Sequence, residues 1–75
     1  MKPGDQVTFP IQLHLRETPE GLLENHLVVQ KDEIGIVLSQ DVVRYQIGTI
    51  DKMVEILTSR GVRGWIHERN VDVVG

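Results

Sequence analysis

The chain has 75 residues, and among them are no cysteine, no alanine and only three aromatic residues. Without cysteine, neither a disulfide framework nor a thiolate metal site can form. Alanine is the best helix former, whereas Val, Ile and Thr, which together supply 22 residues, favour strands. No apolar run approaches the roughly 20 residues that a membrane-spanning helix needs. The composition therefore predicts a mostly β domain without a membrane segment.

Length and charge set further limits. A chain of this size forms a single domain, residues 1–75, and buries only about 60–65% of its unfolded surface. The net charge of −3 provides no general attraction to nucleic acid or anionic lipid, although it is compatible with a local basic patch. The opening Met1–Asp5 is polar and gives no sign of a secretory signal. We expect a cytoplasmic protein, or a component of a virion if a phage encodes it.

Alternation of apolar and polar residues, interrupted by turn residues, indicates where strands lie. Residues 41–51 fit either an extension of a strand or a loop with a hairpin tip at Gly48. Gly35, inside an apolar stretch, indicates a bulge or a close backbone approach. The pattern predicts five short strands, at 6–9, 34–39, 53–58, 62–67 and 71–74. The expected core consists of Val7, Phe9, Ile34, Ile36, Leu38, Val54, Ile56, Val62, Ile66, Val71 and either Val73 or Val74.

The segment from residue 16 to residue 26 breaks the alternation. Thr18 followed by Pro19 is typical of a helix start, and Leu22 with Leu23 would form a small apolar face. About two helical turns fit into this segment. We therefore expect a long, partly helical first loop. The two leucines of this amphipathic segment would either dock on a partner chain or fold onto the domain itself.

The last third of the chain carries a resemblance to a known fold. Gly64-Trp65-Ile66 is followed by residues that suit one turn of tight helix, and then by Val71. This stretch, together with the opening Lys2-Pro3-Gly4-Asp5-Gln6-Val7, resembles the Src-homology-3-like small β-barrels of bacteria and phages. The resemblance implies an all-β, five-stranded barrel with a long first loop. It also implies that Ile66 faces the core while Trp65 faces outward.

The chain departs from the peptide-binding branch of that fold. The branch has several tyrosines in its first loop and a proline at the position of His67, whereas residues 10–33 contain no aromatic residue. A groove for proline-rich peptides needs stacked aromatic walls. No ligand-binding residue is therefore carried over from that branch.

Trp65 is the centre of a candidate contact surface. Arg60, Arg63, His67 and Arg69 are potential cations close to this tryptophan in the sequence, and Arg63 shares its strand face. One interpretation is a basic-aromatic patch that binds phosphate, nucleic acid or an acidic partner. Trp65 would then be an exposed contact anchor, rather than a side chain that lies across the barrel edge and covers the long loop.

The other interpretation of this surface is an ordinary solvated strand face. Glu55 and Glu68 would then pair with the arginines, as the excess of acidic over basic residues suggests. Leu22 and Leu23 complete the set of predicted contact residues. They come from the first loop and would contribute an apolar contact of their own.

Motifs of catalysis and metal binding give no support to an enzyme. The histidines, His14, His26 and His67, are widely spaced, and no phosphate-binding glycine loop or nucleophile motif occurs. We expect no cofactor, no metal site and no catalytic residue. The predicted function is a non-enzymatic protein-interaction or assembly module, an accessory or structural subunit of a larger complex such as a phage virion. The alternative is a nucleic-acid-binding barrel that uses the patch around Trp65.

Overall fold

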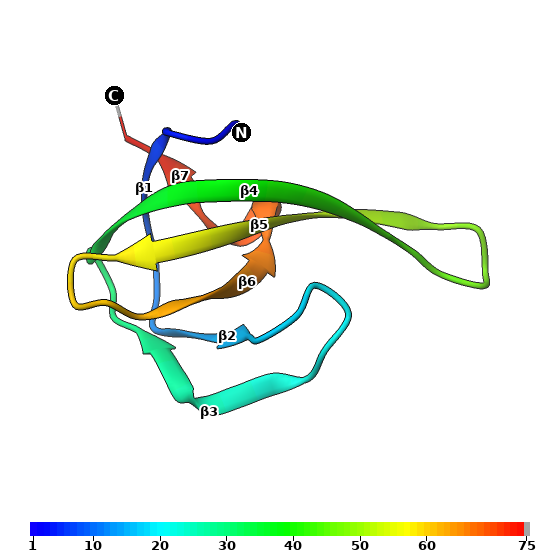
Figure 1. The fold of residues 1–75 in the computed structure, drawn as a ribbon, viewed down its shortest axis with the longest axis horizontal. Coiled ribbons are helices and arrows are strands. Elements are labelled where there is room, and N and C mark those ends of the chain that lie inside the picture. Colours follow the sequence, from blue (N-terminus) through cyan, green and yellow to red (C-terminus); the bar gives the residue numbers. More distant parts are fainter. Residues whose placement is uncertain (75) are drawn as a thin grey trace.

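The structure, a computed structural model, describes residues 1–74 and shows an all-β chain. Its strands form one antiparallel sheet in the order β3-β2-β6-β5-β4-β1-β7, which curls around a common core (Figure 1). The last described strand, β7, pairs with the first strand, β1. The elements are β1 (Gln6–Thr8), β2 (Leu13–Arg16), β3 (Leu23–Val29), β4 (Ile34–Arg44), β5 (Ile50–Thr58), β6 (Arg63–His67), the 3-10 turn η1 (Glu68–Asn70) and β7 (Asp72–Val73).

The prediction of an all-β domain is confirmed, but the prediction of five strands in a closed barrel is wrong. The described residues form seven strands, and the two outermost, β3 and β7, do not pair with each other. The sheet is therefore open. The two additional strands, β2 and β3, come from the stretch between the first two predicted strands. The alternation of Ile11, Leu13 and Leu15 and the short apolar run at 27–29 were visible there, but no separate strand was predicted from them.

The prediction of a partly helical first loop is also wrong. The segment is a hairpin, in which β2 and β3 pair and a turn at Thr18–Gly21 is closed by a hydrogen bond from the Gly21 N–H to the Thr18 carbonyl (3.1 Å). A helix of two turns gains too few hydrogen bonds to offset its nucleation cost. The hairpin instead places Leu15 and Val29 in the core with no exposed surface.

The core contains six of the predicted residues: Val7, Phe9, Val54, Ile56, Ile66 and Val71. The prediction of which β4 residues face the core was wrong by one position. Gly35 and Val37 face inward, whereas Ile34 and Ile36 are 43% and 39% exposed. Val73 and Val74 are exposed, and Leu38 and Val62 are only partly buried. The residues that the pattern missed are Leu15, Val29, Val37, Val43 and Met53.

The phase of β4 follows from the close approach at Gly35. A Cβ atom at this position would lie 2.6 Å from the Ile56 Cγ2 atom and 3.5 Å from the Phe9 ring. Glycine therefore faces the core here, and its neighbours Ile34 and Ile36 face outward. The expected close approach is confirmed, and a bulge follows it, because Leu38 is an extra residue between the pairs Val37–Ile56 and Ser39–Glu55.

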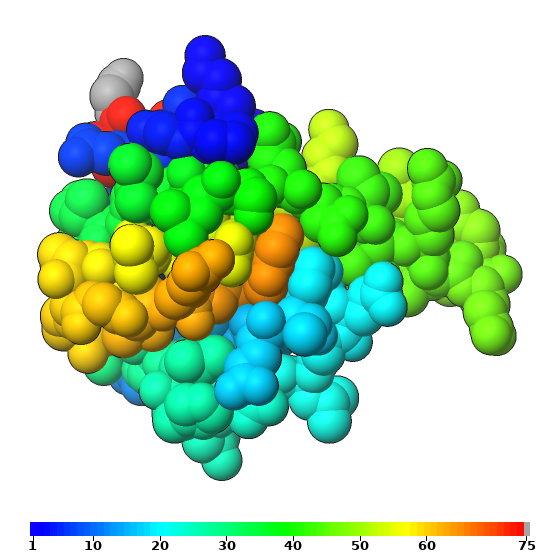
Figure 2. Space-filling view, in the orientation of Figure 1, coloured from blue at the N-terminus to red at the C-terminus, as the bar shows by residue number. Residues whose placement is uncertain are grey.

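Residues 42–52, hereafter the arm, continue β4 and β5 as a two-stranded ribbon beyond the rest of the sheet. On one side β1 pairs with β4 only as far as Ile36, and on the other side β6 pairs with β5 only from Met53 onward. The arm projects from the body in both views (Figures 1 and 2). At its base the Asp41 carboxylate accepts a hydrogen bond from the Val42 N–H at 2.7 Å.

The β2–β3 hairpin joins the main sheet through a narrow contact at β6. Arg16–Trp65 is the one residue pair that links β2 to β6. The backbones come close here because Gly64 has no side chain. A Cβ atom on Gly64 would lie 2.7 Å from the Leu15 Cβ atom and 2.9 Å from the Arg16 carbonyl oxygen. Neither of these atoms can move aside without shifting β2.

We therefore predict that Gly64→Ala destabilises the protein by about 1–3 kcal/mol, the range typical of overpacking a well-packed core. Urea unfolding, followed by circular dichroism and Trp65 fluorescence, measures this effect. Gly21→Ala is the matched control, because its Cβ atom would come close only to the rotatable Thr18 hydroxyl (2.7 Å). Equal unfolding midpoints for the Gly64→Ala variant and the wild type would contradict the proposed close packing.

Candidate interaction surface

Trp65 lies on the outer face of the sheet and is partly buried. Its neighbour Ile66 faces the core and is 4% exposed, as predicted. Trp65 is paired with Glu55 on β5 and with Arg16 on β2, so the three side chains share one face of the sheet. The tryptophan is thus neither a freely exposed anchor nor a core residue.

Arg63 does not contribute an unpaired cation to this face. Its Nε atom donates a hydrogen bond to the Glu55 carboxylate at 2.9 Å, and the Ser39 hydroxyl donates a second one at 2.9 Å. Burial tends to raise the pKa of Glu55, but the hydrogen bonds from Arg63 and Ser39 outweigh it and hold this pKa below its ordinary value. The expected pairing of Glu55 with an arginine is therefore present.

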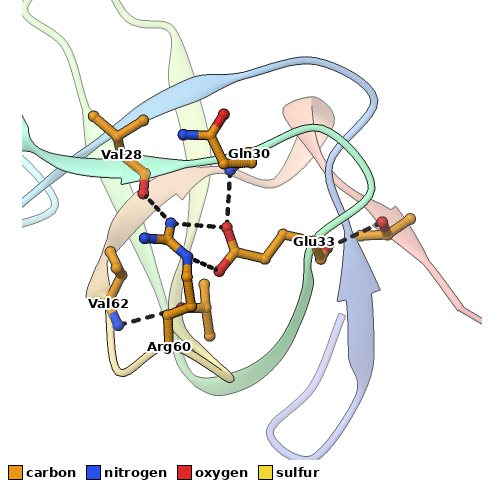
Figure 3. A network of polar contacts seen from close by, with 7 residues as sticks. Val28, Gln30, Glu33, Arg60 and Val62 are labelled. Carbon is orange, nitrogen blue, oxygen red and sulfur yellow. Dashed lines mark hydrogen bonds and ion pairs between the residues drawn. The ribbon is translucent and has the colours of Figure 1, made fainter.

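Arg60 forms a clamp between two turns (Figure 3). Its guanidinium group donates two hydrogen bonds to the Glu33 carboxylate, both of 2.9 Å, and one to the Val28 carbonyl at 2.8 Å. The Gln30 N–H donates to the same carboxylate at 2.9 Å. Arg60 thereby holds the pKa of Glu33 below its ordinary value. These contacts use the guanidinium group to fix the β3–β4 turn against the β5–β6 turn.

Asp51 gathers three other side chains at the base of the arm. Arg69 and the Tyr45 hydroxyl donate hydrogen bonds to its carboxylate, the latter at 3.3 Å. The His67 Nδ1 atom lies 3.3 Å from an Asp51 oxygen but lacks hydrogen-bond alignment, and it has no other partner within residues 1–74. Glu68, which was expected to pair with an arginine, instead lies 3.7 Å from the Met1 amino group.

The surroundings of His67 disfavour its charged form. Burial lowers the pKa of this imidazole, the positive charges of Arg69 and Arg16 lower it further, and Asp51 opposes them. The unfolded chain therefore binds a proton more readily than the folded one. Above pH 6.5, the ordinary pKa of histidine, His67 is neutral in both states and does not change the free energy of unfolding. Below that pH the unfolded chain takes up the proton first, so the stability of the fold decreases as the pH drops.

We predict that His67→Gln reduces the loss of stability between pH 6.5 and about pH 5. The stabilisation from Glu33 and Glu55 is present above their ordinary pKa of 4.5 and is lost only as the pH falls below it, so it does not overlap with this range. Urea unfolding midpoints across pH 5–8 measure the effect. His26→Gln, at an exposed position, serves as the control. An identical pH dependence in the His67→Gln variant and the wild type would contradict the prediction.

Leu22 and Leu23 lie at the tip of the β2–β3 hairpin and are 84% and 57% exposed. They face a groove of about 750 Å³ between this hairpin and the arm, hereafter the arm groove. The hollow between the hairpin tip and the arm is visible at the lower right of Figure 2. The groove is lined by Arg16, Pro19, Glu20, Gly21, Leu22, Leu23, Val43, Arg44 and Tyr45.

The structure divides the predicted contact residues into separate groups. Arg63, Trp65 and His67 share the outer face of β6, whereas Arg60 is part of the clamp and Arg69 binds Asp51. Leu22 and Leu23 belong to the arm groove. Arg16, which also lines the groove, belongs to the 16–26 segment that was already a candidate contact loop. Sequence reasoning missed the groove residues Val43, Arg44 and Tyr45. These three residues lie in the ambiguous stretch 41–51, in which nothing indicated that they would meet the first hairpin.

Comparison with known proteins does not assign the chain to a family. A scan against protein-family models, a search of curated proteins and a search of solved structures each found no significant match for the chain. Within residues 1–74, no helix has the length and apolar character needed to cross a membrane. The same residues contain no cluster of three His, Asp or Glu side chains arranged to hold a metal ion.

Proposed function

We propose that this protein is a non-enzymatic protein-interaction or assembly module that docks through the arm and the arm groove, as a subunit of a larger complex. The observation that carries the proposal is the exposed apolar surface of these two features. Ile47 at the tip of the arm is 85% exposed, and Tyr45 and Ile50 beside it are also exposed. Exposed apolar groups that cluster in this way are typical of protein contact sites.

The construction of the arm supports the same function. A two-stranded ribbon without a third strand or a covering layer is only marginally stable in water. The arm nevertheless extends β4 and β5 well past the sheet, and its tip from Tyr45 to Ile50 carries no charged residue. A partner that covers the tip would supply the packing that the chain itself does not provide. The arm therefore has the form of an insertion element.

The order of the strands supports a proposal about the architecture. A first strand is followed by a hairpin, then by the consecutive strands β4, β5 and β6, a 3-10 turn, and a last strand beside the first. Apart from the hairpin, which stands where a long loop was expected, this order is similar to the one expected from the resemblance to Src-homology-3-like barrels. We propose that the chain is an open variant of that architecture, with its first loop built as the β2–β3 hairpin. Architecture alone does not fix a function.

Binding of nucleic acid through the patch around Trp65 is the weaker proposal. Arg60, Arg63 and Arg69 each contact a carboxylate, so phosphate would have to compete with Glu33, Glu55 and Asp51. A fluorescence titration with DNA and RNA at about 50 mM salt tests it, because phosphate binding is strongest at low salt. Binding that Arg63→Ala weakens would favour nucleic acid over a protein partner.

We predict that Ile47→Ser and the double variant Leu22→Ser, Leu23→Ser each reduce assembly several-fold, since truncating a central apolar anchor often costs more than about 1 kcal/mol. Light scattering after size-exclusion chromatography measures self-assembly. Quantitative affinity capture from a lysate of the source organism measures recovery of other partners. Ile11→Ser is the matched control, because Ile11 is 60% exposed but lies outside the arm and the groove. A monomer that captures no partner would contradict the proposed function, as would an equal effect of Ile11→Ser.

A further inference from the structure

The arginines of this chain fall into two groups. Arg60, Arg63 and Arg69 each form an ion pair with a carboxylate. Arg16 and Arg44, in contrast, make neither an ion pair nor a side-chain hydrogen bond within residues 1–74. Both of them line the arm groove. The two arginines without carboxylate partners therefore line the same groove, on a protein whose net charge is −3.

The two arginines come from opposite sides of the groove. Arg16 is on β2, in the body of the protein, and Arg44 is on β4, in the arm. The lining also includes the aliphatic side chains of Leu22, Leu23 and Val43, and Glu20 is the one carboxylate among the lining residues. A segment that lies in the groove would thus meet apolar side chains together with two guanidinium groups. Guanidinium groups pair with carboxylates through two parallel hydrogen bonds, which adds geometric specificity to the charge attraction.

We propose that the arm groove binds a segment of a partner protein in which apolar residues accompany two or more carboxylates. This proposal rests on the proposed function, and it specifies the partner's chemistry. The arm tip of a second copy fits it poorly, because residues 45–50 are uncharged and would leave both arginines unpaired. Nucleic acid fits poorly as well, since Tyr45 is the one aromatic residue of the lining on which a base could stack.

A random library of twelve-residue peptides, displayed and selected on the immobilised full chain, tests the proposal. We expect the selected peptides to be enriched in Asp and Glu next to Leu, Ile or Val. For a synthetic peptide from the selection, fluorescence anisotropy should show that Arg16→Gln with Arg44→Gln weakens binding at least tenfold, because hydrogen bonds to charged groups are individually strong. Glu20→Gln should strengthen binding, and added salt should weaken it.

Arg63→Gln is the matched control, because Arg63 is bonded to Glu55 outside the groove. Circular dichroism verifies the folding of each variant. Arg44→Gln alone, at an exposed position on the arm, provides the measurement if the change at Arg16 unfolds the chain. A smaller but clear loss of affinity from Arg44→Gln supports the proposal.

Several results would overturn the proposal. The first is a selection that yields no binding peptide, or peptides without an enrichment in Asp and Glu. The second is a double arginine variant that binds the selected peptide as tightly as the wild type does. Self-association through the groove, or nucleic-acid binding that the same variant abolishes, would also overturn it. Loss of partner capture in the Leu22→Ser, Leu23→Ser variant, with no effect of the arginine variants, would refute the charge requirement alone. The proposed function would then stand without it.

Discussion

The close approach of β2 to β6 at Gly64 is the contact on which the arrangement of this molecule depends. Arg16–Trp65 is the one residue pair between β2 and β6, and the missing side chain of Gly64 makes this pairing possible. Leu15 reaches the core through this contact, while Arg16 stays on the outer face. The position of the hairpin relative to the arm, and hence the groove between them, follows from the same contact.

The ion pairs of this protein each fix a small part of the structure. Arg60 fixes two turns to each other, Arg63 satisfies a carboxylate on the outer face, and Arg69 steadies the base of the arm. Ion pairs this exposed contribute little to stability individually. Their effect on function is larger, because they remove three of the arginines as contacts for a ligand. The arginines that stay available, Arg16 and Arg44, are those that the fold brings to the groove.

The all-β class and six of the eleven buried apolar residues could be predicted from the sequence, because apolar alternation is strong in their stretches, and the resemblance gave the inward direction of Ile66. The phase of β4 could not, since Gly35 has no side chain and its inward direction follows only from its contact with Phe9 and Ile56. The β2–β3 hairpin was mistaken for a helical loop because Thr18-Pro19 suits both a helix start and a turn. The groove escaped prediction because it joins Arg16 to Arg44, which are far apart in the sequence.

The bond between Asp41 and the Val42 N–H has a consequence for solubility. A ribbon whose outer strand offers unpaired backbone donors is a template on which further chains can add without limit, as they do in amyloid fibrils. At the base of the arm, the Asp41 carboxylate accepts a hydrogen bond from one such donor, the Val42 N–H, and places a negative charge beside it. At this position the edge of the arm is therefore less able to pair with a further strand, while the apolar side chains of the tip stay exposed.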